Sequence, residues 1–286
     1  MSRKILLVLF ILSLFAVSVF AVGEQEEQPS GSSVTAEENT PNDPRLYQPG
    51  KLTIATGEPV YPPWMMDDNP AGGEGFENGL VYALAEELGF AREDVIWVRQ
   101  TFDQGIVPGK KDYDFILQQY SITEERREFV DFSDVYYSPE KAVVALLNSE
   151  ILNAKTFADL RKVRWGATIG TSDLAYIENI LEVENVAVYN DQVSTFQALL
   201  AGQIDATTIE LPTALYVTAV QVPEASIVAI LPHDPNDLGF GFIFEKGNPI
   251  INWINTGLEA IIAKGVVAEL TAKYLIGDES IPEISQ

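Results

Sequence analysis

From Lys51 onward, short apolar segments alternate with segments that carry one apolar face, and this alternation constrains the fold more than any other feature. Leu80, Leu84 and Leu88, for example, share one face of a helix that ends at a glycine. Strands that alternate with helices at this spacing predict an α/β protein with a largely parallel sheet. The predicted strands are residues 52–55, 95–98, 114–117, 163–167, 186–188 and 206–209, and the predicted helices are residues 79–89, 175–181 and 195–201.

Two further β-rich segments, residues 142–147 and 227–231, do not fit the alternation. We interpret them as crossovers between two lobes. Asp114 is the first residue of a predicted strand and Asp205 directly precedes another, and we expect both carboxylates to brace loops rather than to face a ligand.

The charge and the scarcity of two residue types exclude several functions. With 18 basic and 42 acidic residues, the net charge of −24 argues against binding to nucleic acid or to an anionic lipid surface. The chain has no cysteine and a single histidine, His233, which excludes thiolate chemistry and any site that needs two imidazoles. We expect no metal and no cofactor.

The N-terminus has the three parts of a secretory signal peptide, which we place at residues 1–22. Arg3 and Lys4 precede an unbroken apolar run, residues 5–21, that ends in small residues. The alternative is an uncleaved N-terminal anchor, since the run is just long enough to span a bilayer. Residues 23–49 are polar and acidic and predict a flexible linker. The folded part is therefore expected outside the cytoplasmic membrane, in the periplasm or the extracellular space.

Four motifs together resemble the solute-binding proteins of ABC importers for polar amino acids, bacterial solute-binding protein family 3. The most specific runs from Lys-Asp-Tyr-Asp into Ser-Ile-Thr-Glu-Glu-Arg and then Val-Asp-Phe-Ser-Asp. The others are a Gly-Thr-Ser turn, an Ala-Leu-Leu-Ala-Gly-Gln-Ile-Asp-Ala stretch with an acid beyond it, and a Gly-Phe-Gly-Phe return strand. They occupy residues 111–116, 121–126, 130–134, 165–172, 198–206 and 239–249.

This resemblance implies a periplasmic-binding-protein-like fold of type II, in which two α/β lobes are joined by two hinge crossovers. Lobe 1 would hold residues 50–140 and 235–286, and lobe 2 residues 141–234. The ligand, an amino acid or a similar small zwitterion, would bind between the lobes. A monomer would then deliver it to the ABC permease subunits in the membrane.

Binding a zwitterion in a dry cleft requires that both of its charges be paired, because an unpaired buried ion is costly. The resemblance implies Arg126 as the carboxylate clamp, and its planar fork suits that role. Ser121, Thr171 and Ser172 would add hydroxyl and N–H donors, and Glu210 would pair with the ammonium, although the family usually has aspartate there.

The resemblance also implies aromatic walls from Tyr61, Trp64 and Phe102, although Trp64 is equally compatible with a packed loop. The main departure from the family is a bulky step, Gln118, Gln119 and Tyr120, where relatives have small residues. This step would narrow the cleft or add polar partners, and so favour a smaller ligand or one with a polar side chain.

Two other functions remain open on the same fold. Some proteins that resemble this family are dehydratases of the cyclohexadienyl type, and Glu210 would supply their catalytic acid. The second is a sensory module that passes its ligand signal to a membrane receptor. Because no nucleophile, metal cluster or histidine base is visible, we expect a binding protein rather than an enzyme.

Overall fold

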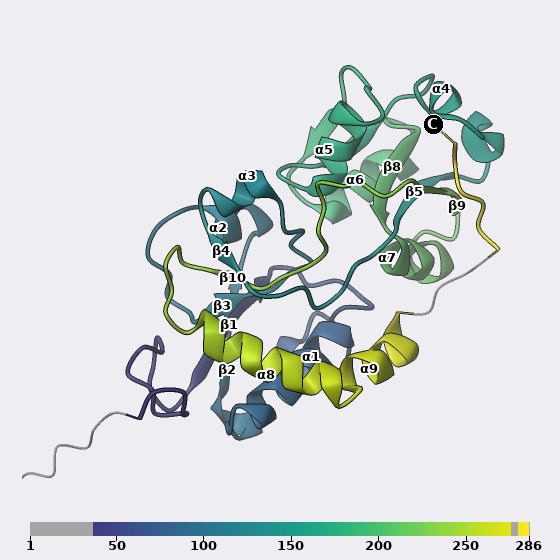
Figure 1. Cartoon of the computed structure of the whole chain (residues 1–286). Helices are drawn as coiled ribbons and strands as arrows, with labels where there is room; N and C mark the ends of the chain where they lie inside the picture. Colours follow the sequence, from purple (N-terminus) through teal and green to yellow (C-terminus); the bar gives the residue numbers. More distant parts are fainter. Residues whose placement is uncertain (1–36, 276–279, 286) are drawn as a thin grey trace, which may run out of the picture. The chain divides into compact units, whose positions relative to one another are not determined.

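The computed structural model describes residues 37–275 and 280–285, whose strands lie in separate sheets belonging to two α/β lobes (Figure 1). The sheet of lobe 1 has the strand order β2-β1-β3-β10-β4. Strand β1 runs parallel to β2 and β3, whereas β10 is antiparallel to β3 and β4. These strands are β1 (Leu52–Gly57), β2 (Val95–Gln100), β3 (Phe115–Ile116), β4 (Asp131–Phe132) and β10 (Ile243–Phe244).

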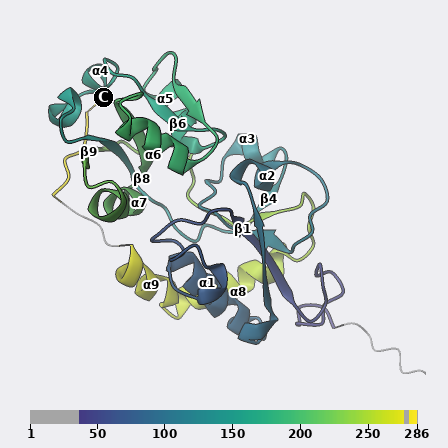
Figure 2. The same ribbon diagram turned by 180° about the vertical axis from the view of Figure 1, so that it is seen from behind.

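Three helices of lobe 1 lie side by side in both ribbon views (Figures 1 and 2): α1 (Phe76–Glu87), α8 (Ile251–Ala263) and α9 (Val266–Tyr274). Helix α1 buries Leu80 and Leu84 as its apolar spacing predicts, and both belong to the main core of the lobe. The shorter helices of this lobe are η1 (Pro70–Gly72), η2 (Arg92–Asp94), α2 (Phe102–Ile106) and α3 (Glu124–Arg127).

Lobe 2 is built on a three-stranded antiparallel sheet in which β5 lies between β8 and β9. A parallel pair, β6 and β7, lies beside it through a bridge between Trp165 and Ala206. The strands are β5 (Lys141–Leu146), β6 (Gly166–Thr168), β7 (Ala187–Tyr189), β8 (Ala206–Glu210) and β9 (Ala225–Leu231). The helices are η3 (Glu150–Asn153), α4 (Phe157–Leu160), α5 (Ser172–Asn179), α6 (Gln192–Leu200), α7 (Leu211–Tyr216) and the π-helical turn η4 (Val217–Gln221).

The expectation that residues 142–147 and 227–231 are crossovers is wrong. They are β5 and β9, which pair with each other inside lobe 2, so its central sheet is antiparallel rather than parallel. The crossovers themselves lie between β4 and β5 and between β9 and β10, where Tyr137 and Phe240 form an antiparallel bridge. Because nearly every side chain of β5 is buried, its sequence has no alternation that would reveal a sheet strand.

Residues 37–49 are not the flexible linker that their polarity predicts. Leu46 is buried in the core of lobe 1, and the backbone N–H of Tyr47 donates to Asp114 Oδ1 at 2.7 Å. The carboxylate of Asp43 is buried and accepts hydrogen bonds from Arg45 and from the backbone of Asn39. These local hydrogen bonds compensate for the shortage of apolar residues, which is why composition alone is misleading here.

The two bracing aspartates are confirmed. Asp114 accepts backbone N–H bonds from Tyr47 and Thr53, and so fixes the start of β1 to the segment before it. Asp205 accepts a backbone and two guanidinium bonds from Arg164, next to the start of β8.

The C-terminal segment corrects the predicted boundary of lobe 1. Residues 280–285 pack on lobe 2, where Ile284 is buried in the core and its N–H donates to Ile230 O at 2.9 Å. Ser285 forms a bridge with Thr156 in the same lobe. The described part of lobe 1 therefore ends near Leu275, which is buried in the core of lobe 1.

The predicted signal peptide, residues 1–22, and the first part of the predicted linker, residues 23–36, lie outside the described residues. Among the helices that the structure describes, none has the length and the hydropathy needed to cross a membrane.

Candidate ligand-binding site

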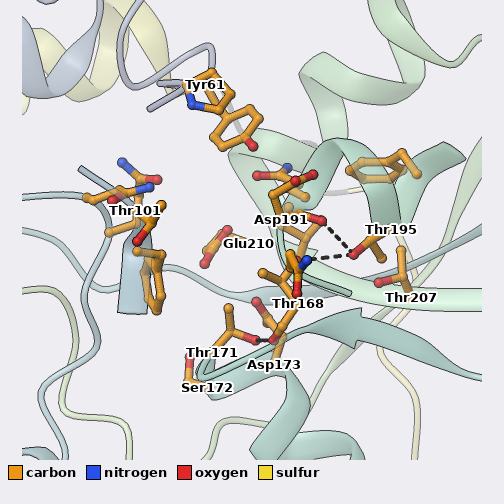
Figure 3. Close-up of a pocket in the computed structure, with 18 of the residues that line it drawn as sticks. Tyr61, Thr101, Thr168, Thr171, Ser172, Asp173, Asp191, Thr195, Thr207 and Glu210 are labelled. Carbon is orange, nitrogen blue, oxygen red and sulfur yellow. Dashed lines mark hydrogen bonds between the residues drawn. The ribbon is translucent and has the colours of Figure 1, made fainter. Parts of the chain in front are cut away.

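A cavity of about 180 Å³ lies between the two lobes and receives side chains from both (Figure 3). Lobe 1 lines it with residues from the loop after β1, the start of α2 and the loop after β3. Lobe 2 lines it with the ends of β6, β7 and β8 and the starts of α5 and α6. The lining residues are Glu58, Pro59, Tyr61, Thr101, Phe102, Gln118, Gln119, Thr168, Thr171, Ser172, Asp173, Asn190, Asp191, Gln192, Thr195, Phe196, Thr207, Thr208, Ile209 and Glu210.

The lining carries four acidic side chains and, within the described part of the chain, no basic one. The acids are Glu58, Asp173, Asp191 and Glu210. Most other side chains are hydroxyls and amides, which can donate or accept hydrogen bonds. A cavity of this composition favours a positively charged ligand, because its carboxyl groups can pair with a cation, whereas its lining has no basic side chain among the described residues that could pair with an anion.

Glu210 is the last residue of β8, and Figure 3 shows its carboxyl group in the space between Thr101 of lobe 1 and Thr168 of lobe 2. Burial and the charge of Asp173 raise its pKa to about 8, even though the charge of Lys141 lowers it. Without a ligand, this carboxyl group is therefore mostly protonated at neutral pH. A cation placed beside it would favour the ionised form.

A buried ion cluster lies next to the cavity. The Lys141 ammonium is 2.8 Å from Ser172 Oγ, 3.2 Å from Asp173 Oδ1 and 3.5 Å from Asp237 Oδ2. Ser121 Oγ donates to Asp237 Oδ2 at 2.7 Å and lies 2.9 Å from Ser172 Oγ, so the cluster joins the two lobes.

Lys141, Asp173 and Asp237 were not among the site residues predicted from the sequence. The available signal was Lys141 itself, a cation directly before a run of six apolar residues. Such a lysine becomes buried with its strand and then needs carboxylate partners. Those partners are distant in sequence, so only the fold reveals them.

Arg126 is buried but does not line the cavity. Its guanidinium donates to Ser121 O at 2.7 Å and, across to lobe 2, to Gly170 O at 2.8 Å. The Phe102 ring lies 5.7 Å from it, and burial lowers the pKa of the group. In this structure the predicted carboxylate clamp is thus engaged by two backbone carbonyls. Ser121 is likewise absent from the lining, because its hydroxyl group is bonded within the ion cluster.

Trp64 does not form a wall of the cavity. Its ring is buried against Phe76, Tyr137 and Phe240 in the core of lobe 1. Its Nε1–H donates to Thr213 Oγ1 at 2.8 Å, which is a further hydrogen bond between the lobes. This position agrees with the alternative of a packed loop aromatic.

Tyr61 and Phe102 do lie at the cavity, together with Thr171 and Ser172. Phe102 is held by a stacked contact with Tyr120, whose ring centroid is 4.5 Å away. Burial and the nearby Asp191 charge raise the pKa of Tyr61 to about 12, so its hydroxyl group stays neutral.

The Gln118-Gln119-Tyr120 step fits because other parts of lobe 1 make room for it. A Cβ atom on Gly57 would lie 2.4 Å from Gln118 Nε2, so the end of β1 has no side chain where Gln118 needs space. A Cβ atom on Gly105 would lie 2.2 Å from the Tyr120 hydroxyl oxygen. That hydroxyl donates to Phe102 O at 2.7 Å and so ties α2 to this step.

Gln119 has the left-handed backbone φ of 52° and is held by a buried acid of α1. Its backbone N–H donates to Glu77 Oε1 at 3.0 Å, and its Nε2 donates to Glu77 Oε2 at 2.5 Å. Gln118 is only 7 % exposed and also lines the cavity. The step therefore adds polar groups to the cavity, which was one of the two expected effects.

Comparison with known proteins agrees with this architecture. The probable histidine-binding protein of Campylobacter jejuni is 29% identical over 231 residues, which cover 78% of this chain and 85% of the relative. The L-arginine-binding protein of Pseudomonas aeruginosa is 27% identical and covers 77% of this chain and 86% of its own. A solved ancestral arginine-binding protein bound to glutamine is 26% identical, with a TM-score of 0.68, and covers 81% of this chain and 100% of its own. The model of the bacterial extracellular solute-binding proteins, family 3, matches residues 52–277, and the chain belongs to this family.

Proposed function

We propose that this protein captures a basic amino acid outside the cytoplasmic membrane and delivers it to an ABC importer. The observation that carries the proposal is the acidic lining of the cavity, four carboxyl groups without a basic side chain among the described residues. Membership of the family and the names of the histidine- and arginine-binding relatives support it.

Each positive charge of such a ligand has an acidic counterpart in the cavity. Glu210 suits the α-ammonium group, as its counterpart does in the family pattern. Asp191 caps the start of α6, its charge helps to raise the pKa of Tyr61, and it is one counterpart for the distal charge of the side chain (Figure 3). Tyr61 and Phe102 add aromatic faces, which attract a guanidinium or ammonium group.

The α-carboxylate requires donors that the lobes now use to hold each other. The Arg126–Gly170 and Ser121–Ser172 hydrogen bonds cross between the lobes, so opening the cleft breaks both. We infer that the freed guanidinium and hydroxyl groups then bind the carboxylate, together with the backbone N–H groups at the start of α5. A ligand that contacts both lobes stabilises the closed form, and hinge closure is the established motion of periplasmic binding proteins.

The export and the partner belong to the same proposal. The leader-like residues 1–22 would carry the chain across the membrane, where the closed and loaded monomer would engage the permease subunits. The sensory function differs only in the partner. A pull-down from membranes that recovers a receptor, rather than a permease with its ATPase, would favour the sensory function.

Catalysis of the cyclohexadienyl type is less compatible with the cavity. Its substrate prephenate carries two carboxylates, and the part of the lining that the structure describes offers them four acids and no basic partner. The protonated Glu210 is the one feature that such an enzyme would use. Turnover of prephenate or arogenate by the purified protein would establish the enzyme instead.

The proposal is tested by calorimetric titration of the full-length protein with arginine, lysine, histidine, citrulline, glutamine and glutamate. Citrulline is the uncharged isostere of arginine, so this pair isolates the side-chain charge. We expect at least one basic amino acid to bind, and arginine to bind about tenfold or more tightly than citrulline, the factor expected for one desolvated charge pair. Tighter binding of glutamate or citrulline than of every basic amino acid would contradict it.

A further inference from the structure

Glu77 is a buried acid that the proposed ligand does not touch. It lies in the first turn of α1 with no exposed surface, and it is absent from the cavity lining. Its two oxygens accept three hydrogen bonds, from the Tyr136 hydroxyl group at 2.5 Å and from two groups of Gln119. Glu77 therefore contacts Gln119, which lines the cavity, without lining the cavity itself.

These bonds fix which groups Gln119 can present to the cavity. Its backbone N–H and one N–H of its side-chain amide are bonded to Glu77, so its two carbonyl oxygens and a single remaining amide N–H are left for the cavity that it lines. Carbonyl oxygens accept hydrogen bonds from an ammonium or guanidinium group, and they do not favour an anion. The left-handed backbone of Gln119 is a strained conformation for this residue and needs such fixed partners to persist.

The environment of Glu77 is built for an acceptor. Burial raises its pKa to about 7, whereas the bonds from Tyr136 and Gln119 lower it. A glutamine in its place would offer one carbonyl oxygen to three donors, and its own NH₂ group would face them. At least one donor would then lose its partner, and the amide of Gln119 would be free to turn its NH₂ group toward the ligand.

We propose that Glu77 is a positioning residue that orients Gln119 and thereby sets the preference of the cavity for a charged ligand over its uncharged isostere. The inference rests on the proposed function. The unusual Gln118-Gln119-Tyr120 step and Glu77 then act together. Helix α1 supplies the acid that orients a side chain of the loop after β3, and so influences which ligand that loop selects.

The test is the Glu77→Gln protein, titrated calorimetrically with arginine and citrulline at one pH. We expect the ratio of the citrulline to the arginine dissociation constant to fall about tenfold relative to the natural protein, the scale of one charge-assisted hydrogen bond. A purely structural role would weaken both ligands equally and leave the ratio unchanged.

Two further variants make the test specific. Glu86→Gln removes the same charge from an exposed position of the same helix, and it should leave the ratio unchanged. Gln119→Leu removes the side-chain bond to Glu77 but keeps the backbone N–H bond, and it serves if Glu77→Gln does not fold. It should lower the ratio by itself, and adding Glu77→Gln to it should lower the ratio by less than Glu77→Gln does alone.

The outcomes separate the two proposals. A natural protein that does not prefer arginine to citrulline overturns the proposed function, and this inference with it. A natural protein with that preference, unchanged in folded Glu77→Gln or in Gln119→Leu, overturns the inference alone.

Discussion

At the residue scale, ionisable groups are the most informative part of the site. Buried acids with shifted pKa values are concentrated at binding and catalytic sites, and Glu210 at the cavity is such an acid. The direction of this pKa shift determines how ligand affinity depends on pH, because a cationic ligand prefers the ionised carboxylate.

We expect the affinity for a basic amino acid to rise between pH 6 and 8, by about tenfold per unit at most. Below its pKa of about 8, Glu210 must release a proton before it can pair with the ammonium group. Titration calorimetry in two buffers of different ionisation enthalpy measures the released proton. Constant affinity over this interval, with no proton released, would show that the ligand does not reach Glu210.

Glu210→Gln should weaken ligand binding and yet stabilise the free protein at pH 8. The folded-state pKa of Glu210 is raised, so its contribution to stability is complete below the unfolded pKa and is lost as pH rises toward 8. An amide does not ionise and escapes this loss. Thermal unfolding of both proteins at pH 5 and pH 8 checks it, and a stability difference that does not depend on pH would contradict it.

Arg126 and its neighbour Arg127 provide a matched pair. Arg126→Lys should weaken ligand binding about tenfold or more, since one ammonium group cannot replace a planar fork that reaches two oxygens. Arg127→Lys, at an exposed position beside Glu124, should leave binding unchanged. Calorimetric titration compares them. Near-unchanged affinity in Arg126→Ala would remove Arg126 from the site.

At the scale of elements, the fit between α2 and the loop after β3 depends on a missing side chain. Gly105 leaves room for the Tyr120 hydroxyl group, which bonds to the backbone of Phe102. The position of an aromatic wall of the cavity thus depends on a glycine three residues away in the same short helix.

Gly105→Ala should destabilise the protein by about 1–3 kcal/mol, the usual cost of an overpacked core. In a Tyr120→Phe background the same change should cost less, because the hydroxyl oxygen 2.2 Å from the new Cβ is gone. Denaturant unfolding of the two single variants and the double variant gives the coupling energy. Additive effects would show that the close approach to this oxygen is not the cause.

Local sequence patterns predicted the α/β class, six of the ten strands and three of the nine α-helices that the structure describes, because those elements have a clear spacing of apolar residues. They failed where the answer depends on distant partners. Nothing near Leu46 in the sequence indicates the core in which it is buried, and nothing near β5 indicates that its neighbours are antiparallel.

The candidate site divides in the same way. Tyr61, Phe102 and Glu210 were predicted from the family resemblance, and they do line the cavity. Trp64 and Arg126 match the family pattern equally well, but their final partners, Thr213 and Gly170, belong to the other lobe. Glu77 was missed because its function depends on Gln119, 42 residues further along the chain.

At the scale of the whole molecule, the described ends of the chain belong to different lobes. The segment around Tyr47 packs on lobe 1, and the segment that ends at Ser285 packs on lobe 2. Between them the chain passes from lobe 1 to lobe 2 and back through the crossovers that flank β5 and β9. A third passage follows α9, because Leu275 is buried in lobe 1 and Ile284 in lobe 2.

Because the two described ends lie on different lobes, energy transfer between dyes attached to them would report ligand binding. The chain has no cysteine, so Tyr47→Cys and Ser285→Cys would accept one donor and one acceptor dye without competition from other thiols. Each dye would ride on a different lobe, and energy transfer between them would report closure in real time. The transfer efficiency should change as arginine is added, with the same midpoint that calorimetry gives. The labelled protein would then act as a sensor of its ligand.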